Sequence, residues 1–262
     1  MKLETMSVEK LDYGVQVITI SNPPANTLNL AIQNDLLKII EEVENDPSIR
    51  ALVFKSGNPK IFIAGADLSQ MGGGSGEVDY AEGAKQLQDI FNALEAIRVP
   101  TVAAINGHAL GGGCEFVLAC DFRIMGAGSI GLTEASLGLL PAAGGTQRMT
   151  KLVGGAKARE LMFFSKRLKA EEAESIGLVT KAVAPEKVEE EAIQLAMTLA
   201  QGAVGAIGLI KESILAAELP LEQGLKVERE AFAKTFATGE PAEGVRAFFE
   251  KRPPNFAKQV TT

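Results

Sequence analysis

The sequence predicts an α/β protein whose core is a largely parallel sheet. Two observations carry this prediction: β-branched segments alternate with segments of helical periodicity, and the chain is long enough to cover a sheet with helices. Of its 262 residues, 46% are apolar and 23% are charged, a balance typical of soluble globular proteins. We therefore expect one large domain, or one domain with a small appendage.

The alternation is clearest in the N-terminal part of the chain. Residues 15–20 have the β-branched pattern of a strand, which we expect to pair with the segment before the turn at Tyr13 and Gly14. In the next segment, apolar side chains recur at helical spacing against polar ones. The elements expected in order are a helix at 29–44, a strand at 51–54, a helix at 80–97 and a strand at 99–105.

The chain changes character near Pro185. Residues 178–183 have a strand pattern, whereas beyond Pro185 a helical pattern rich in Ala, Leu, Glu and Lys continues to the end. We divide the chain into a core, residues 1–184, and a helical region, residues 185–262. Within the core, the glycine-rich run at 72–76 predicts a mobile loop.

The net charge of −7 limits the partners. Binding to nucleic acid phosphates or to anionic lipid needs clustered Lys and Arg, so we expect no nucleic-acid partner and no membrane association. Residues 1–10 have neither the apolar run of a secretory signal nor the Arg-rich character of a transit peptide. No apolar stretch reaches spanning length. The expected location is therefore the cytoplasm.

The two cysteines and the single histidine limit the chemistry. Cys114 and Cys120 fall six residues apart in one predicted helix, on different faces, so we expect buried free thiols. A Ser–His–Asp arrangement would need His108 and a serine in a nucleophile-elbow sequence, and no such serine is present. The sequence also lacks a zinc-ligand set, a P-loop and a dinucleotide fingerprint. We expect neither a metal nor a cofactor.

The most informative segment is 106–116, which follows an expected buried strand and opens an apolar helix. The consecutive glycines at 111–113 let the backbone approach a ligand, and N–H groups at a helix start carry partial positive charge. An oxyanion could be held there. The alternative is that these glycines only allow close packing. Residues 63–68 offer a second such element, in which Asp67 could cap the following turn.

Two glutamates near these segments are candidate acid and base groups. Glu115 falls in the first turn of the expected helix, where the helix dipole favours the anionic form. Glu134 follows Thr133, a possible helix N-cap, and burial among apolar neighbours could raise its pKa. Each glutamate could instead be an ordinary favourable charge at a helix start. The catalytic interpretation requires that both face one pocket.

Together these residues resemble the crotonase, or enoyl-CoA hydratase/isomerase, family over nearly the whole chain. The resemblance implies a spiral of ββα units, followed by a helical C-terminal region that packs against neighbouring subunits in a trimer or a dimer of trimers. The matching blocks are residues 22–29, 64–68, 106–115 and 140–148, with the closing pattern at 249–256.

The family resemblance also implies a site and a reaction. The amides of Ala66 and Gly112 would hold the thioester carbonyl of an acyl-CoA, Glu115 would activate water for attack at C3, and Glu134 would deliver a proton to C2. The product would be a 3-hydroxyacyl-CoA, in fatty acid or branched-chain degradation. Coenzyme A would enter as part of the substrate. The expected substrate-binding residues are Ala25, Ala64, Gly65, Asp67, Leu68 and Gly111.

Two departures from the family pattern bear on these expectations. Ala142 stands where many relatives carry glycine, which is harmless if its φ is negative, and residues 23–26 lack the usual basic residue. Candidate contacts for the CoA phosphates are Lys60, Arg98, Lys251 and Arg252. Three alternatives to hydration of ordinary enoyl-CoA stay open: an isomerase, a specialised methylglutaconyl-type hydratase, and a non-catalytic binding or scaffold protein with the same fold.

Overall fold

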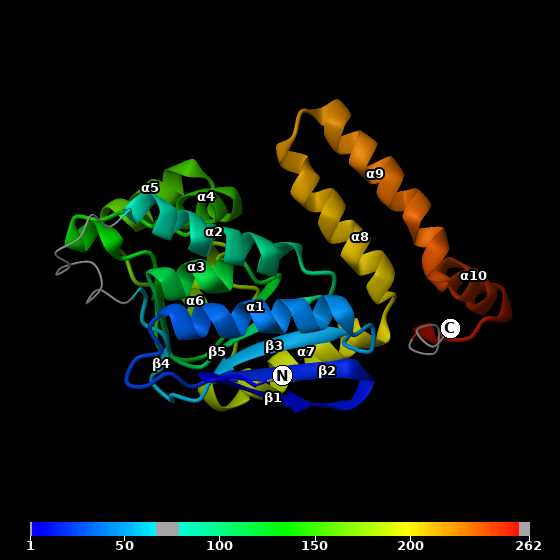
Figure 1. Cartoon of the computed structure of the whole chain (residues 1–262), viewed down its shortest axis with the longest axis horizontal. Coiled ribbons are helices and arrows are strands. Elements are labelled where there is room, and N and C mark those ends of the chain that lie inside the picture. The colour runs from blue at the N-terminus through cyan, green and yellow to red at the C-terminus, as the bar shows by residue number, and fades with distance from the viewer. Residues whose placement is uncertain (1, 67–78, 257–262) are drawn as a thin grey trace.

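The computed structural model describes residues 2–66 and 79–256 (Figure 1). Its main sheet has six strands, and a smaller sheet has three. In the main sheet β1 is antiparallel to β2, and every other neighbouring pair is parallel. The main sheet runs in the order β1(Met6–Lys10), β2(Val15–Ile20), β3(Ala51–Ser56), β5(Thr101–Ile105), β7(Phe122–Met125) and β9(Lys181–Ala182).

The small sheet accounts for the expected spiral of ββα units. Its strands are parallel and run in the order β4(Ile61–Ile63), β6(His108–Leu110) and β8(Ile130–Gly131). Each follows a strand of the main sheet directly along the chain: β3 leads to β4, β5 to β6 and β7 to β8. Two strands and a helix therefore repeat, with one strand in each sheet. The expected α/β fold of ββα units is confirmed.

Helices cover one face of the main sheet and pack around a cluster of aromatic rings. The ring of Phe116 contacts those of Phe54, Phe62 and Phe91 at centroid distances of 5.2, 6.0 and 5.9 Å. All four side chains are fully buried. The helices that follow β2 through β8 are α1(Leu30–Asn45), α2(Tyr80–Ala96), α3(Gly112–Leu118), α4(Gly145–Val153), α5(Gly155–Phe163) and α6(Ala170–Ser175).

The opposite face of the sheet is covered by α7(Val188–Gln201). Ala192, Ala196 and Ala200 recur at helical spacing and are fully buried against the valines of β2, β3 and β5. Small side chains let this helix lie close to the sheet. The division at residue 184 remains a prediction, but α7, which follows it, belongs structurally to the sheet core.

The remaining helices form a C-terminal arm, residues 204–250, which stands apart from the core in Figure 1. It consists of α8(Val204–Leu215), α9(Leu221–Thr235) and α10(Glu240–Glu250). Two buried charged groups fix its base. The Arg50 guanidinium donates to the carbonyls of Ala200 and Gly202, and the Glu240 carboxylate accepts from the N–H groups of Gly205 and Ala206 at 2.8 Å.

Short 3-10 turns occur at η1(Asp12–Gly14), η4(Pro185–Lys187), η5(Ala216–Glu218) and η6(Phe236–Thr238).

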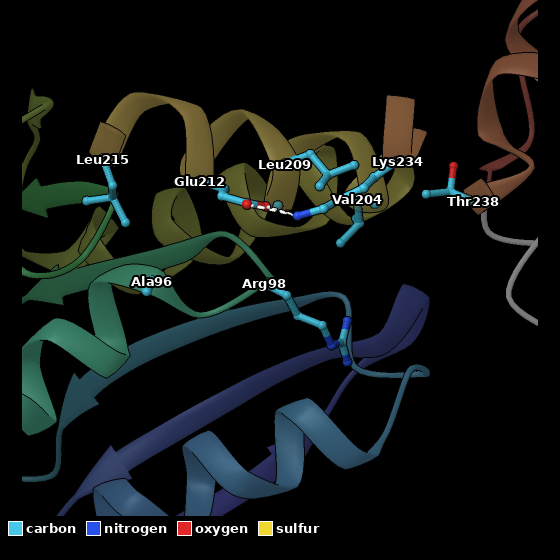
Figure 2. Close-up of a pocket in the computed structure, with 10 residues that line it drawn as sticks. Ala96, Arg98, Val204, Leu209, Glu212, Leu215, Lys234 and Thr238 are labelled. Atoms are coloured by element: carbon cyan, nitrogen blue, oxygen red, sulfur yellow. Dashed lines mark hydrogen bonds and ion pairs between the residues drawn. The ribbon is translucent and has the colours of Figure 1, made fainter. Parts of the chain in front are cut away.

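A cavity of about 580 Å³ lies between this arm and the end of α2 (Figure 2). Its charged side chains already have partners. Lys234 reaches from α9 to Glu212 on α8 at 2.9 Å, and Arg98 on the opposite wall donates to the carbonyls of Val43, Asp46 and Ile49. Lys234 and Arg98 are therefore paired within the protein, and Arg98 holds the end of α1. The contact of Arg98 with a CoA phosphate stays a prediction.

Two expectations about elements need correction. The strand expected at 178–183 is reduced to β9, because Gly177 has a φ of +76° and the chain is still turning where Leu178 enters the core. Cys120 lies beyond the end of α3, which stops at Leu118, although both thiols are free and buried as expected.

Across residues 2–66 and 79–256, no single helix is long and apolar enough to cross a membrane. The pair Pro185–Gln201 and Val204–Glu218 reaches that length and composition only together, across a bend of 103°.

Candidate active site

The ends of β4 and α3 bring two backbone amides close together. After β4, Gly65 takes a φ of +121°, and its carbonyl accepts from the N–H of Leu28 at 2.9 Å, which fixes the chain at Ala66. A Cβ on Gly112 would lie 3.4 Å from the Ala66 nitrogen. Gly112 is the first residue of α3, where helix N–H groups lack intrahelical acceptors. Within the described chain, neither amide donates to a main-chain carbonyl.

Close packing of the glycine run is what creates this arrangement. A Cβ on Gly113 would collide with the carbonyl of Ile63, and one on Gly112 would lie 2.8 Å from the Leu28 side chain. Glycine at both positions therefore lets the start of α3 touch the end of β4. The packing interpretation of these glycines is correct for Gly113, and it is the reason that the amides of Gly112 and Ala66 can face one ligand atom.

Glu134 lies against Gly111, the residue before Gly112. Gly111 has a φ of +54°, and its N–H donates to the carbonyl of Gly131 at 2.9 Å, which continues the pairing of β6 with β8. A Cβ on Gly111 would lie 3.1 Å from Glu134 Oε1. Oε2 of Glu134 is buried and has no hydrogen-bond partner among the described residues. Burial raises the pKa of Glu134, although the backbone N–H groups of Glu134 and Thr133 oppose the change.

The local structure around Glu134 differs from the expected helix start. Residues Glu134–Leu137 form a single 3-10 turn, η3, and the Thr133 side chain makes no capping hydrogen bond. The Thr133 carbonyl instead accepts from the Ser136 hydroxyl at 2.7 Å. Because no α-helix follows, a helix dipole does not explain Glu134, and the ordinary helix-start interpretation of this residue is wrong.

Glu115 is buried in the first turn of α3, with 3% of its surface exposed. Its Oε1 accepts from the N–H of Ala143 at 2.7 Å and from the N–H of Gly145 at 2.8 Å. Burial and the charge of Glu134 raise the pKa of Glu115, the two N–H donors and Arg148 lower it, and the net pKa is about 7. The expectation that the helix dipole keeps Glu115 anionic was incomplete, because desolvation outweighs it.

The charge of Glu134 raises the pKa of Glu115, so the two carboxyls lie within range of each other's charge. Glu134 lies against Gly111, just before α3, whereas Glu115 lies against Gly145, the first residue of α4. That both carboxyls face one pocket stays a prediction. Such a pair can hold one proton and exchange it with a substrate, since environments that raise both pKa values disfavour two charges.

A third charged group, Arg148 of α4, holds the loop whose N–H groups bind the Glu115 carboxylate. Arg148 is 7% exposed, and its Nη1 donates to the carbonyl of Ala143 at 3.1 Å. Its other nitrogens donate to Asn92 and Glu95 of α2. Sequence analysis gave Arg148 no role. The available signal was a polar stripe on α2, in which Gln88, Asn92 and Glu95 share one helix face.

A cavity of about 540 Å³ borders this loop, between α2 and residues 140–151. Its walls include Gln88, whose amide donates to the carbonyl of Ala142 at 2.7 Å. Ala142 does not adopt a positive φ, so alanine replaces the family's glycine there without strain. Residues 140–151 thus form part of the cavity wall, and the same segment supplies the N–H groups that bind the Glu115 carboxylate.

The other expected substrate-binding residues divide into two groups. Ala25 and Ala64 support the segment that carries the Ala66 amide, because the N–H of Ala64 donates to the carbonyl of Ala25 at 3.2 Å. Asp67, Leu68 and the glycine-rich run at 72–76 lie outside the described residues.

The candidate phosphate contacts are dispersed. Lys60 is exposed just before β4, while Lys251 and Arg252 follow α10 at the far end of the arm (Figure 1). The Arg252 guanidinium is already paired with Glu243 at 2.7 Å and with Glu250 at 2.6 Å. Within one subunit, the arm does not bring Lys251 or Arg252 to the glutamate pair.

The single histidine and both cysteines have surroundings of their own. His108 Nδ1 lies 2.9 Å from the Ser129 hydroxyl, and burial raises the pKa of both cysteine thiols. In the part of the chain that the structure describes, no group of three or more His, Cys, Asp or Glu side chains could hold a metal ion.

Comparison with known proteins agrees with this geometry. A family model described as enoyl-CoA hydratase/isomerase matches residues 10–259. A probable enoyl-CoA hydratase of Mycobacterium bovis is 38% identical over 98% of this chain and 99% of its own length. A short-chain-enoyl-CoA hydratase of Clostridium acetobutylicum is 37% identical over 96% and 97%.

Solved structures give the same result. The crystal structure of an enoyl-CoA hydratase from Bacillus anthracis superposes with a TM-score of 0.89 at 36% identity, over 96% of this chain and 98% of the other. The structure of DspI from Pseudomonas aeruginosa has a TM-score of 0.89 at 39% identity, over 97% of each chain. The chain belongs to the enoyl-CoA hydratase/isomerase, or crotonase, family.

Proposed function

We propose that this protein is a 2-enoyl-CoA hydratase, which adds water across the C2=C3 double bond of a trans-2-enoyl-CoA to give a 3-hydroxyacyl-CoA. One observation carries the proposal: the Glu134 carboxyl lies against Gly111 and its charge acts on the buried Glu115 carboxyl, while the neighbouring amides of Ala66 and Gly112 have no main-chain acceptor among the described residues. Family membership and relatives named enoyl-CoA hydratase or crotonyl-CoA hydratase support the same reaction.

The two amides would bind the thioester carbonyl oxygen. Addition of water to C3 moves electrons through the conjugated system to that oxygen, so negative charge develops there in the transition state. Each well-placed N–H donor stabilises such a charge by on the order of 3 kcal/mol. Polarisation of the carbonyl also makes C3 more electrophilic. The first task of the Ala66 and Gly112 amides is thus to turn an unreactive alkene into an acceptor for water.

Glu115 would act as the base. Its carboxylate takes a proton from water while the water oxygen bonds to C3, and the amides of Ala143 and Gly145 hold Oε1 in place. Both of these hydrogen bonds go to Oε1, which leaves Oε2 for the water. A pKa of about 7 suits this role, because a base works best when its pKa lies near the working pH.

Glu134 would act as the acid. Its buried Oε2 has no partner within the described residues, which favours the protonated carboxyl, and that proton goes to C2 as the enolate collapses. Water supplies one proton to Glu115 and Glu134 gives one to the product. One proton must then return from Glu115 to Glu134 before the next turnover. Water and the thioester supply every atom of the product, so the reaction requires no cofactor.

The direct test is loss of the conjugated thioester absorbance of crotonyl-CoA when purified protein is added. We expect turnover by the wild type and a loss of at least about 10³-fold in kcat for Glu115→Gln and for Glu134→Gln. Mass spectrometry of the products then separates hydration, which adds one water, from isomerisation, which adds none. Failure to hydrate 2-enoyl-CoA substrates of any chain length, methylglutaconyl-CoA included, would refute the proposal.

We further propose a trimer or a dimer of trimers, because the arm exposes large apolar side chains that a lone subunit would leave in water. In such an assembly Lys251 or Arg252 of one subunit could reach the CoA phosphates of another, and Lys60 those of its own. Sedimentation velocity of the intact chain tests the assembly. The exposed apolar side chains of the arm include Ile210, Ile214, Leu221, Phe232, Phe236, Phe248 and Phe249.

A further inference from the structure

We propose that Arg148, held by Asn92 and Glu95 of α2, is a positioning residue that fixes the Glu115 carboxylate through the loop at residues 143–145. The inference rests on the proposed function and assigns to α2 and Arg148 a role in that reaction. Arg148 would not touch the substrate. It would act by holding the backbone whose N–H groups bind Glu115.

The two hydrogen-bonding groups of Ala143 connect Arg148 to Glu115. The Ala143 carbonyl accepts from Arg148 Nη1 at 3.1 Å, and the Ala143 N–H donates to Glu115 Oε1 at 2.7 Å. Gly144, next in the chain, has a φ of +98°, and a side chain there would collide with the same guanidinium. The guanidinium therefore occupies the inside of this turn, and the N–H groups of the turn bind the Glu115 carboxylate.

The α2 helix holds the guanidinium with a set of polar side chains on one face. Arg148 Nε and Nη2 both donate to Glu95 Oε2, at 2.9 and 2.7 Å, and Nη2 also donates to Asn92 Oδ1 at 2.7 Å. One turn earlier, Gln88 donates to the carbonyl of Ala142 at 2.7 Å. Every guanidinium nitrogen thus has an acceptor. A planar fork can meet three acceptors in different directions, whereas a lysine ammonium on a flexible stem cannot reproduce that geometry.

Arg148 also acts on Glu115 electrostatically. The charged groups that act on Glu115 from the elements packed around it are Glu134 of η3, which raises its pKa, and Arg148 of α4, which lowers it. The backbone donors of residues 143 and 145 lower it too. Loss of the cation therefore raises the pKa of Glu115 and narrows the pH range in which the base is ionised. A residue that only tied α2 to α4 would change stability and leave this pH dependence unchanged.

The experiment compares Arg148→Lys, Arg148→Gln and Asn92→Ala with the wild type, with Glu115→Gln and with Arg159→Gln as a control. Arg159 is an exposed arginine on α5, one helix further along the chain. The measurements are kcat and kcat/KM for crotonyl-CoA from acidic to alkaline pH, together with melting temperature. The protonation of Glu115 is followed separately by difference infrared spectroscopy against Glu115→Gln, which needs no turnover.

We expect Arg148→Lys to lose about tenfold in kcat with the acidic limb of kcat/KM unmoved, because the charge stays and the fork is lost. Arg148→Gln should lose at least as much kcat, and its limb and infrared titration should move to higher pH. Asn92→Ala should lower kcat less, and Arg159→Gln should match the wild type. If Arg148→Gln does not fold, Arg148→Lys and Asn92→Ala carry the test of positioning.

Wild-type kcat and an unmoved titration in the Arg148 variants, with Glu115→Gln inactive, would overturn the inference while the proposed function stands. An inactive wild type would overturn the proposed function instead. In that case the infrared titration of Glu115 decides: a shift to higher pH in Arg148→Gln supports the link between the two residues, and an unmoved titration removes it.

Discussion

Substituting Gly145 with alanine would test the position of the Glu115 carboxylate with a single methyl group. Gly145 is the first residue of α4 and does not have a positive φ, so its backbone accepts alanine without strain. The added Cβ would lie 2.8 Å from both Cγ and Oε1 of Glu115, and 3.0 Å from the Leu132 side chain. These distances are several tenths of an ångström shorter than ordinary van der Waals contacts between heavy atoms.

The methyl group must therefore displace the carboxylate, because Leu132 is also buried and closes the other side. Overpacking of this kind costs about 1–3 kcal/mol, which lowers the melting temperature of a chain of this size by several degrees. Displacement of a reacting group by about 1 Å can cost as much as 10²-fold in rate. We therefore expect Gly145→Ala to lose between about tenfold and 10²-fold in kcat while it stays folded.

The assay is hydration of crotonyl-CoA, with thermal melting in parallel. Gly83→Ala is the matched control: it adds the same methyl to a helix, nothing lies within 4 Å of its Cβ, and it should stabilise the protein by up to about 1 kcal/mol without a change in kcat. Wild-type kcat in Gly145→Ala would refute the reasoning, because the carboxylate would then lie elsewhere or take no part in the reaction.

Three further predictions concern ionisation and the arm. The kcat/KM for hydration should rise with pH through about 7 as Glu115 ionises, and fall at higher pH when the pair loses its remaining proton; a flat profile from pH 5 to 9 would contradict this. Because burial raises the folded-state pKa of Glu115 above its unfolded value, the folded state loses stability as pH rises between about 4.5 and 7. Glu115→Gln should thus be more stable than the wild type at pH 8, by up to about 3 kcal/mol, and nearly equal to it at pH 4 in urea unfolding. Glu240→Ala should destabilise the base of the arm by about 1–2 kcal/mol, seen as a lower melting temperature, since two N–H groups at the start of α8 lose their acceptor.

Local pattern was sufficient to predict most elements of the fold. The strand at 15–20 and the helix from Asn29 were found because β-branching and the helical spacing of apolar residues leave their signal in neighbouring residues. The structure adds that Asn29 caps α1 by accepting from the N–H of Ile32. The segment at 178–183 failed for the converse reason. Leu178 and Val179 are apolar because they fill the core beside α6, and such burial in a turn has the same sequence pattern as a strand.

The residues of the candidate site could be predicted from the sequence, but their pKa values could not. The glycine run and both glutamates stand out in the sequence, but the raised pKa of Glu115 depends on burial by elements far away along the chain. Arg148 was missed because its role joins three segments. Its acceptors on α2 lie more than fifty residues before it, and the loop that it supports matters only through Glu115 on a third element.

The competing interpretations of the glycine run, packing and ligand binding, prove to be cause and effect. Gly113 must be glycine because the carbonyl of Ile63 occupies the space of a side chain, and Gly111 because its φ is positive and Glu134 lies against it. Those packing contacts bring the first amide of α3 beside Ala66 and set Glu134 near Glu115. A side chain at Gly113 would push the start of α3 away from β4 and so move the two amides apart. In this fold, close contact between β4 and α3 therefore brings the two amides together, while Glu134 lies against Gly111 and Glu115 lies against Gly145.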